Sequence, residues 1–245
     1  RAAAHPTPTA PPYREVAAAL HTWYLLQGTT ALTQGVALFH DLQFRRLGLG
    51  EETQQHLLRA GLQRQLTPAL ALAAGYAHVY TAPYGAQPAA APFDERRLWE
   101  QVALKGSYLG GRLEALHRYR LEQRWAQNPA DLAAPRGLQN RVRYLLRLTL
   151  ALGEVGGTPV SLSALDELFV NVGEAARLNV LDQNRLGGAV GLALRPQVTL
   201  EVGYQLQTIL KGRLAEETGR QLMEQNHTLT VGVVTKLDVG GAPGR

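Results

Sequence analysis

The feature that most constrains this chain is a period-two alternation of apolar and polar residues, which recurs almost everywhere after residue 18. In the segment 137–151, leucine, valine and tyrosine dominate one set of alternate positions, while arginine, glutamine and threonine dominate the other. Successive side chains of a β-strand point to opposite faces of its sheet. The pattern is therefore typical of strands with one apolar and one polar face.

The alternation indicates eleven segments, most of them longer than the five or six residues common in soluble sheets. Their lengths match the roughly 9–11 residues that a tilted strand needs to cross a bilayer, plus an overhang. Two stretches, EVAAALHTWYLL (15–26) and QQHLLRAGLQRQL (54–66), could instead form amphipathic helices. The segments are about 18–29, 35–46, 55–66, 69–82, 96–108, 112–126, 137–151, 158–171, 182–195, 198–210 and 226–238.

The connections between these segments alternate in length. Short turns at 30–34, 66–68, 107–111, 153–158 and 195–197 alternate with longer loops at 47–55, 83–95, 127–137, 172–180 and 211–225. Short periplasmic turns and longer extracellular loops are typical of bacterial outer-membrane barrels. We therefore expect an all-β fold, namely a transmembrane, up-and-down, antiparallel β-barrel with a polar lumen.

Single-chain bacterial barrels normally have an even number of strands. We therefore expect about twelve strands, with ten as the alternative. Residues 12–32 could hold two short strands, the tail could pass through the lumen, or one segment could lie outside the wall. The barrel should form one domain over residues 14–239. Residues 1–13 are rich in alanine and proline and should form a flexible tail, and residues 240–245 a short C-terminal tail.

Composition narrows the function classes. The 245-residue chain has no cysteine, which excludes disulfides and thiolate chemistry, and its 25 Lys+Arg exceed its 20 Asp+Glu. No run of 18 apolar residues suggests a transmembrane helix, and no signal peptide is evident. Either the protein is cytosolic or a signal has been removed. Because we interpret the chain as a membrane barrel, we expect that a signal peptide has been removed. We also expect the protein to lie in the bacterial outer membrane, in contact with its lipid.

Two arrangements could explain the two faces. In a soluble two-sheet protein the apolar faces would pack together and the arginines would lie outside. In a membrane barrel the apolar face would contact lipid. Strand length and loop asymmetry favour the membrane barrel, as do the tyrosines that share the apolar face, namely Tyr24, Tyr76, Tyr80, Tyr119, Tyr144 and Tyr204.

The membrane interpretation places many charged side chains in the lumen, with twelve cations (including Arg97, Lys105 and Lys236) against five carboxylates (including Glu114). These charges could plug the barrel through arginine–carboxylate networks, or form a narrow pore or pocket that attracts small anions. We expect a narrow or plugged barrel with a cationic lumen that binds or passes small anionic solutes. The predicted lumen-lining residues are Asp41, Arg45, Arg59, Arg118, Arg120, Glu122, Arg124, Arg141, Arg143, Arg147, Glu167, Arg185 and Glu201.

Two other functions stay open. A barrel with a closed lumen could be structural or could bind partners, including other outer-membrane proteins, through loops 83–95 and 211–225. A lipid-modifying enzyme would need a serine and a histidine in contact.

The chemistry-bearing residues favour neither an enzyme nor a cofactor protein. The histidines do not cluster in sequence, and His40, His78, His117 and His227 should face outward. Asp166 and Glu167 are adjacent, so they should point to opposite faces and mark a bulge or the outer rim. No phosphate loop, metal-ligand spacing or dinucleotide fingerprint is present. We expect no catalytic activity, cofactor, metal or nucleic-acid partner.

Five motifs resemble a known family. WEQVALK (99–105), HRYRLEQRW (117–125), NRVRYLLRLTL (140–150), DELFVN (166–171) and LDQNRLGGAVGLAL (181–194) occur in this order. Together they resemble the outer-membrane β-barrel family catalogued as domain of unknown function (DUF) 2490, found largely in Bacteroidota and other Gram-negative bacteria. The similarity runs from about Trp23 to Val239. The resemblance implies a barrel in the outer membrane and implies no reaction.

Overall fold

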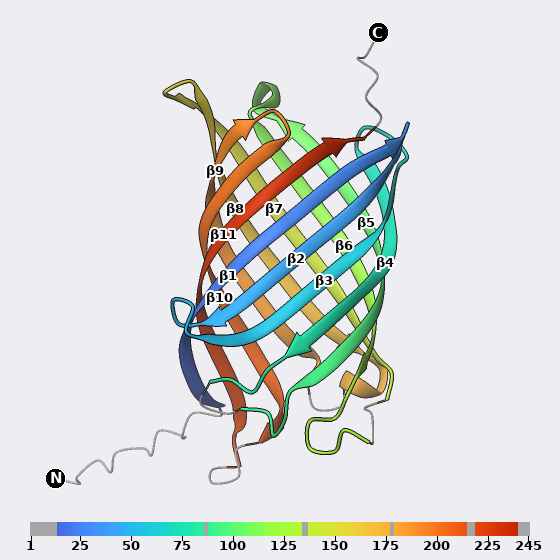
Figure 1. Ribbon diagram of the computed structural model, residues 1–245, viewed down its shortest axis with the longest axis vertical. Helices are drawn as coiled ribbons and strands as arrows, with labels where there is room; N and C mark the ends of the chain where they lie inside the picture. Colours follow the sequence, from blue (N-terminus) through green and yellow to red (C-terminus); the bar gives the residue numbers. More distant parts are fainter. Residues whose placement is uncertain (1–13, 86–87, 134–136, 177–178, 215–218, 240–245) are drawn as a thin grey trace, which may run out of the picture.

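The alternating segments form a closed β-barrel in the computed structural model, which describes residues 14–85, 88–133, 137–176, 179–214 and 219–239 (Figure 1). The predicted tails, 1–13 and 240–245, lie outside the described residues. The eleven strands are β1 (Arg14–Thr33), β2 (Val36–Leu47), β3 (Glu52–Gln65), β4 (Leu70–Thr81), β5 (Phe93–Tyr108), β6 (Leu113–Ala126), β7 (Gln139–Val155), β8 (Thr158–Val172), β9 (Leu181–Arg195), β10 (Val198–Leu214) and β11 (Gln221–Asp238).

The all-β prediction is confirmed, and both stretches that could have been helices are strands. The described residues contain two short 3-10 turns, Leu109–Gly111 and Gly173–Ala176. No helix among the described residues is long and apolar enough to span a membrane.

The strand count differs from the expected twelve and from the alternative of ten. Consecutive strands pair antiparallel around the barrel, and β1 closes it by pairing in parallel with β11, for example at Trp23 and Thr230. Residues 14–33 form one strand of 20 residues and not two short strands. Because the count is odd, Arg14 and Asp238 lie at opposite ends of the barrel (Figure 1).

The two ends of the barrel carry different connections. At one end, called here the short-turn end, hairpins turn at Gly35 and at the pair Gly156–Gly157. These glycines have φ angles of 77°, 58° and 76°, which glycine adopts at little cost. The other end, called the long-loop end, has the longer connections. Two predicted loops are shorter than expected, because β5 begins at Phe93 while β10 and β11 extend over most of 211–225.

The alternation separates two faces. On β7, Val142 and Leu148 are about two-fifths exposed on the outside, whereas Arg141 and Arg143 are buried in the interior. Asp166 and Glu167 pair regularly with Leu186 and Arg185, and the neighbouring irregularity lies between Phe169 and Val170. The prediction of a bulge at Asp166–Glu167 is therefore wrong. The barrel encloses an interior lined mainly by charged, amide and small side chains.

Candidate functional site

A buried carboxylate, Glu122 on β6, organises the middle of the barrel. It is fully buried and accepts hydrogen bonds from Arg141 Nη2 (2.6 Å), Arg143 Nη1 (2.7 Å) and Arg59 Nη2 (3.3 Å). Arg59 also donates to Asp41 at 2.7 Å. Arg141 and Arg143 come from β7, the neighbour of β6, whereas Arg59 comes from β3, so its bond to Glu122 connects strands that are not neighbours.

A second carboxylate, Glu167 on β8, extends the network. Its Oε1 accepts hydrogen bonds from Arg118 and Arg143, each at 2.6 Å, while Oε2 lies 3.6 Å from Arg185. Arg143 therefore links Glu122 to Glu167. Charges removed from water need such partners, and charge-assisted bonds are the strongest available. We call Asp41, Arg59, Arg118, Glu122, Arg141, Arg143 and Glu167 the ionic layer.

Three large aromatic side chains fill the interior beside the ionic layer. Trp23, Trp99 and Phe169 are 2%, 1% and 1% exposed. The guanidinium of Arg185 lies 4.9 Å from the Trp23 ring centre and 4.7 Å from that of Phe169, within the range of cation–π attraction. These cation–π contacts pack the guanidinium of Arg185 against two aromatic rings, in addition to its contact with Glu167. The sequence interpretation did not place these aromatics in the lumen.

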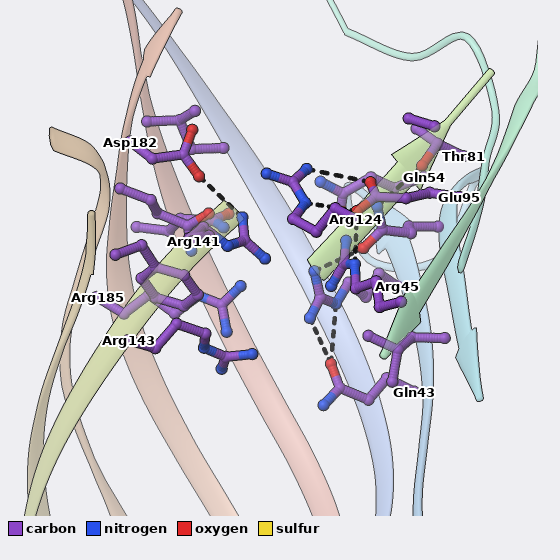
Figure 2. A pocket seen from close by; sticks show the side chains of 18 of the residues that line it. Gln43, Arg45, Gln54, Thr81, Glu95, Arg124, Arg141, Arg143, Asp182 and Arg185 are labelled. Atoms are coloured by element: carbon purple, nitrogen blue, oxygen red, sulfur yellow. Dashed lines mark hydrogen bonds and ion pairs between the residues drawn. The ribbon is translucent and has the colours of Figure 1, made fainter. Parts of the chain in front are cut away.

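A cavity of about 210 Å³ occupies the long-loop half of the interior. Guanidinium groups approach it from two sides, as Figure 2 shows: those of β7 and β9 on one side, and those of β2 and β6 on the other. We call it the arginine recess. It is bordered by Arg45, Arg59, Arg97, Arg124, Arg141, Arg143 and Arg185.

Two carboxylates at the recess are already paired. Glu95 accepts hydrogen bonds from Arg124 (2.5 Å) and Arg97 (2.6 Å), and Asp182 accepts one from Arg141 (2.8 Å). Both lie at the long-loop end of their strands. Neither was among the predicted lumen residues, and Glu95 fell inside the predicted loop 83–95. They neutralise part of the positive charge of the recess.

Arg45 differs from the other arginines of the recess. It donates to the amide oxygens of Gln43 (2.5 and 3.0 Å) and Gln55 (2.8 Å), and its guanidinium lies 3.9 Å from the Trp23 ring centre. Among the described residues it forms no ion pair with a carboxylate. Arg185, which also lies near the Trp23 ring, reaches a carboxylate among the described residues only at Glu167, at 3.6 Å. Two buried cations of the recess are therefore weakly compensated.

A larger cavity of about 770 Å³ occupies the short-turn half. Its lining includes Ala103, Gly188 and Ala189, whose small side chains leave the space open. The arginine recess and this cavity have four lining residues in common, Gln43, Arg59, Arg143 and Arg185, which lie at the boundary between them.

The predicted lumen residues all lie inside the barrel. Eleven of the thirteen line one or both cavities, and the remaining two, Arg120 and Glu122, are 1% and 0% exposed. Arg120 donates to Gln101 at 2.5 and 3.0 Å and lies 5.0 Å from the Trp99 ring centre.

Residues with catalytic or ligating chemistry do not converge. The side-chain partners of His40, His78, His117 and His227 are Thr235, Asp94, Tyr144 and Tyr204 respectively. No histidine–serine hydrogen bond occurs in the described part of the chain. Nor do the described residues contain a group of three or more His, Cys, Asp or Glu side chains that could hold a metal ion.

Comparison with known proteins gives one match. The model of the family described as "Protein of unknown function (DUF2490)" matches residues 20–213, a range that includes all five motifs quoted above. No curated protein and no solved structure matches the chain.

Proposed function

The chain belongs to the DUF2490 family, and we propose that it is an outer-membrane barrel that binds a small anion in the arginine recess. The observation that supports this most is the convergence of seven guanidinium groups on one cavity, where Arg45 has no carboxylate partner among the described residues. The planar guanidinium group of arginine can donate two parallel hydrogen bonds to the oxygens of a carboxylate, a phosphate or a sulfate.

The charge balance of the interior favours an anion. Ten buried or half-buried arginines face six carboxylates that are also buried or half-buried, in the ionic layer and around the two cavities, and the more exposed Glu114 also lines the larger cavity. The arginines are Arg45, Arg59, Arg97, Arg118, Arg120, Arg124, Arg141, Arg143, Arg147 and Arg185, and the carboxylates are Asp41, Glu95, Glu122, Glu167, Asp182 and Glu201. An uncompensated buried charge is costly, so a bound anion would stabilise the barrel.

The outer face supports a membrane location. The closed sheet leaves no unpaired strand edge, which a backbone in lipid requires. Its outward side chains include many leucines and valines, such as Leu62 (58% exposed) and Val202 (52% exposed). A soluble barrel would bury such a face inside, and a water-exposed apolar patch of this extent would promote aggregation. Lipid is the solvent that suits this surface.

A second candidate is a closed structural barrel without a ligand. It is favoured by the pairing already present, since Arg124, Arg141 and Arg143 each contact a carboxylate at 2.7 Å or less. The loops 83–95 and 211–225, through which such a barrel would act, are described only in part.

Ligand-dependent stability separates the two candidates. We expect inorganic phosphate or sulfate to stabilise the refolded barrel in detergent more than chloride at equal ionic strength. The gain should reach about 2.7 kcal/mol at about 100 times the Kd. Arg45→Gln should reduce the stabilisation by phosphate or sulfate, and this substitution deprives no described carboxylate of an ion-pair partner. Adding Arg185→Gln should remove the stabilisation.

The matched control is Arg96→Gln, because Arg96 lies on β5 but faces outward. This variant should respond to phosphate as the parent does. Equal stabilisation of the parent and the Arg45→Gln, Arg185→Gln double variant would exclude the recess as the site. No stabilisation of the parent by any of these anions would favour the structural barrel.

A further inference from the structure

The outward-facing side chains change character at one level of the barrel. Between the short-turn end and this level they are mainly leucine and valine, as Leu104, Leu148, Leu162, Val190 and Val202 illustrate with exposures of 39–52%. Closer to the long-loop end, polar and charged side chains appear among the apolar ones. The outer face of the strands is therefore not uniform along the barrel axis.

Tyrosines mark the transition. β4, β6 and β10 all start at the short-turn end, and each carries an outward tyrosine six residues after its first residue: Tyr76 after Leu70, Tyr119 after Leu113 and Tyr204 after Val198. These side chains are 45%, 46% and 44% exposed. Tyr24 on β1 and Tyr144 on β7 also face outward, and the ring of Tyr144 lies tilted against that of Tyr119 with ring centres 5.0 Å apart. We call these five side chains the tyrosine ring.

Polar side chains follow the tyrosine ring towards the long-loop end. On neighbouring strands they pair: His78 with Asp94 (3.1 Å), Gln123 with Glu100 (3.2 Å), Asn184 with Asp166 (2.6 Å) and His227 with Tyr204 (2.7 Å). We call the outward side chains at this level the polar collar, consisting of His56, His78, Arg96, Glu100, Gln123, Asp166, Asn184 and His227.

The polar collar fits the border of a bilayer and not its centre. Glu100 and Asp166 are exposed on the outer face, and each accepts a hydrogen bond from an amide of the collar. Charged side chains on the lipid face of a barrel are costly at the midplane and tolerated near the interface. Tyrosine likewise concentrates at the level of the headgroups.

Strand length agrees with this border. From the short-turn end to the collar, β4 runs over the nine residues Leu70–His78 and β6 over the eleven residues Leu113–Gln123. A tilted strand needs about 9–11 residues to cross a bilayer. The complete strands have 12–20 residues, so each has a surplus over this length. On β1, β10 and β11 that surplus is several residues long.

We infer that lipid covers the outer face only from the short turns to the polar collar, and that the long-loop part of the barrel projects into water. Phospholipid acyl chains contact the leucine and valine band, and headgroups contact the tyrosine ring and the collar. The inference rests on the proposed membrane location. It places the arginine recess, which lies in the long-loop half, from the level of the border into the part that projects from the bilayer.

Spin labels on single cysteines test this border, and the cysteine-free chain needs no background substitutions. The barrel is reconstituted in vesicles of phosphatidylcholine and phosphatidylglycerol, and accessibility to oxygen and to a water-soluble nickel chelate is measured. Leu148→Cys and Leu138→Cys form a matched pair, since both replace an exposed leucine near or on β7, ten residues apart. Asn184→Cys reports on the collar itself.

We expect the label at 148 to be accessible to oxygen and protected from nickel, the label at 138 to show the reverse, and the label at 184 to be intermediate. Lipid-like accessibility at both 138 and 148 would overturn the inference, because the bilayer would then cover the long-loop half. Flotation of the vesicles on a density gradient provides the separate control. Protein that folds but fails to float with lipid would instead contradict the membrane location.

Discussion

The two halves of the barrel interior are built by the same eleven strands, yet they are filled differently. The long-loop half has a cavity of about 210 Å³ bordered by arginines, and the short-turn half has one of about 770 Å³ with alanine and glycine in its lining. Both halves have the same number of strands around them. The size and charge of the inward side chains therefore decide how open each half is.

The halves also differ in how their charges are paired. Glu122, at the boundary, serves three guanidinium groups and is fully buried. In the short-turn half, Arg147 pairs with Glu201, and Lys105 with Glu114, in pairs that are partly open to water. Removing a charge should therefore cost much more in the ionic layer than beyond it.

The largest expected effect is that of Glu122→Gln. It leaves three buried arginines without their shared carboxylate and should lower the free energy of unfolding by about 3–5 kcal/mol. Glu201→Gln is the matched control in the short-turn half and should cost about 1 kcal/mol. Urea unfolding followed by tryptophan fluorescence measures both. Similar losses for the two variants would show that the two halves do not differ in this way.

Gly61→Ala should have an intermediate effect. Gly61 faces Gly75 on β4, and a methyl group at Gly61 would lie 2.3 Å from the Ala74 carbonyl oxygen and 2.6 Å from Cζ2 of Trp99. We expect a loss of about 1–3 kcal/mol, because the buried indole and the backbone must both move. At Gly232 the nearest atoms belong to Leu25, at 3.3–3.7 Å. Gly232→Ala should therefore change stability less in the same unfolding experiment.

The smallest expected effect is that of Lys105→Gln. Lys105 Nζ lies 3.5 Å from Glu114, and both side chains are more than two-fifths exposed. Such a pair contributes less than about 1 kcal/mol, and salt screens it. The difference between variant and parent should shrink further between low salt and 1 M salt. A loss as large as that of Gly61→Ala would mean that the short-turn half depends on ion pairs as much as the ionic layer does.

Much of the wall could be predicted from the sequence, because period-two alternation reports directly on which side chains share a face. Each of the eleven alternating segments overlaps one strand. The predicted number of twelve strands was wrong because it followed the rule that single-chain bacterial barrels have an even number of strands. Alternation holds no information on whether the closing strand pair is parallel or antiparallel. The parallel pairing of β1 with β11 also provides hydrogen-bond partners for the backbone groups at the closure.

The interior was harder to predict. Trp99 lies between the inward residues Arg97 and Gln101, and Phe169 follows Glu167 by two positions, so their positions in the alternation indicated an inward direction. Their apolar character masked that signal. The convergence of Arg59 and Arg143 on Glu122 could not be predicted, because it depends on side chains that meet across the lumen from strands far apart in the sequence.

We propose that the ionic layer and its aromatic neighbours close the lumen between the two cavities. Conductance of the purified barrel in planar lipid bilayers tests it most directly. We predict insertion without steady ion conductance at neutral pH, because the hydrogen-bonded arginines and carboxylates and the buried aromatic rings fill the middle of the barrel. Reproducible ohmic channels of uniform size, whether selective for anions or cations, would contradict a closed lumen.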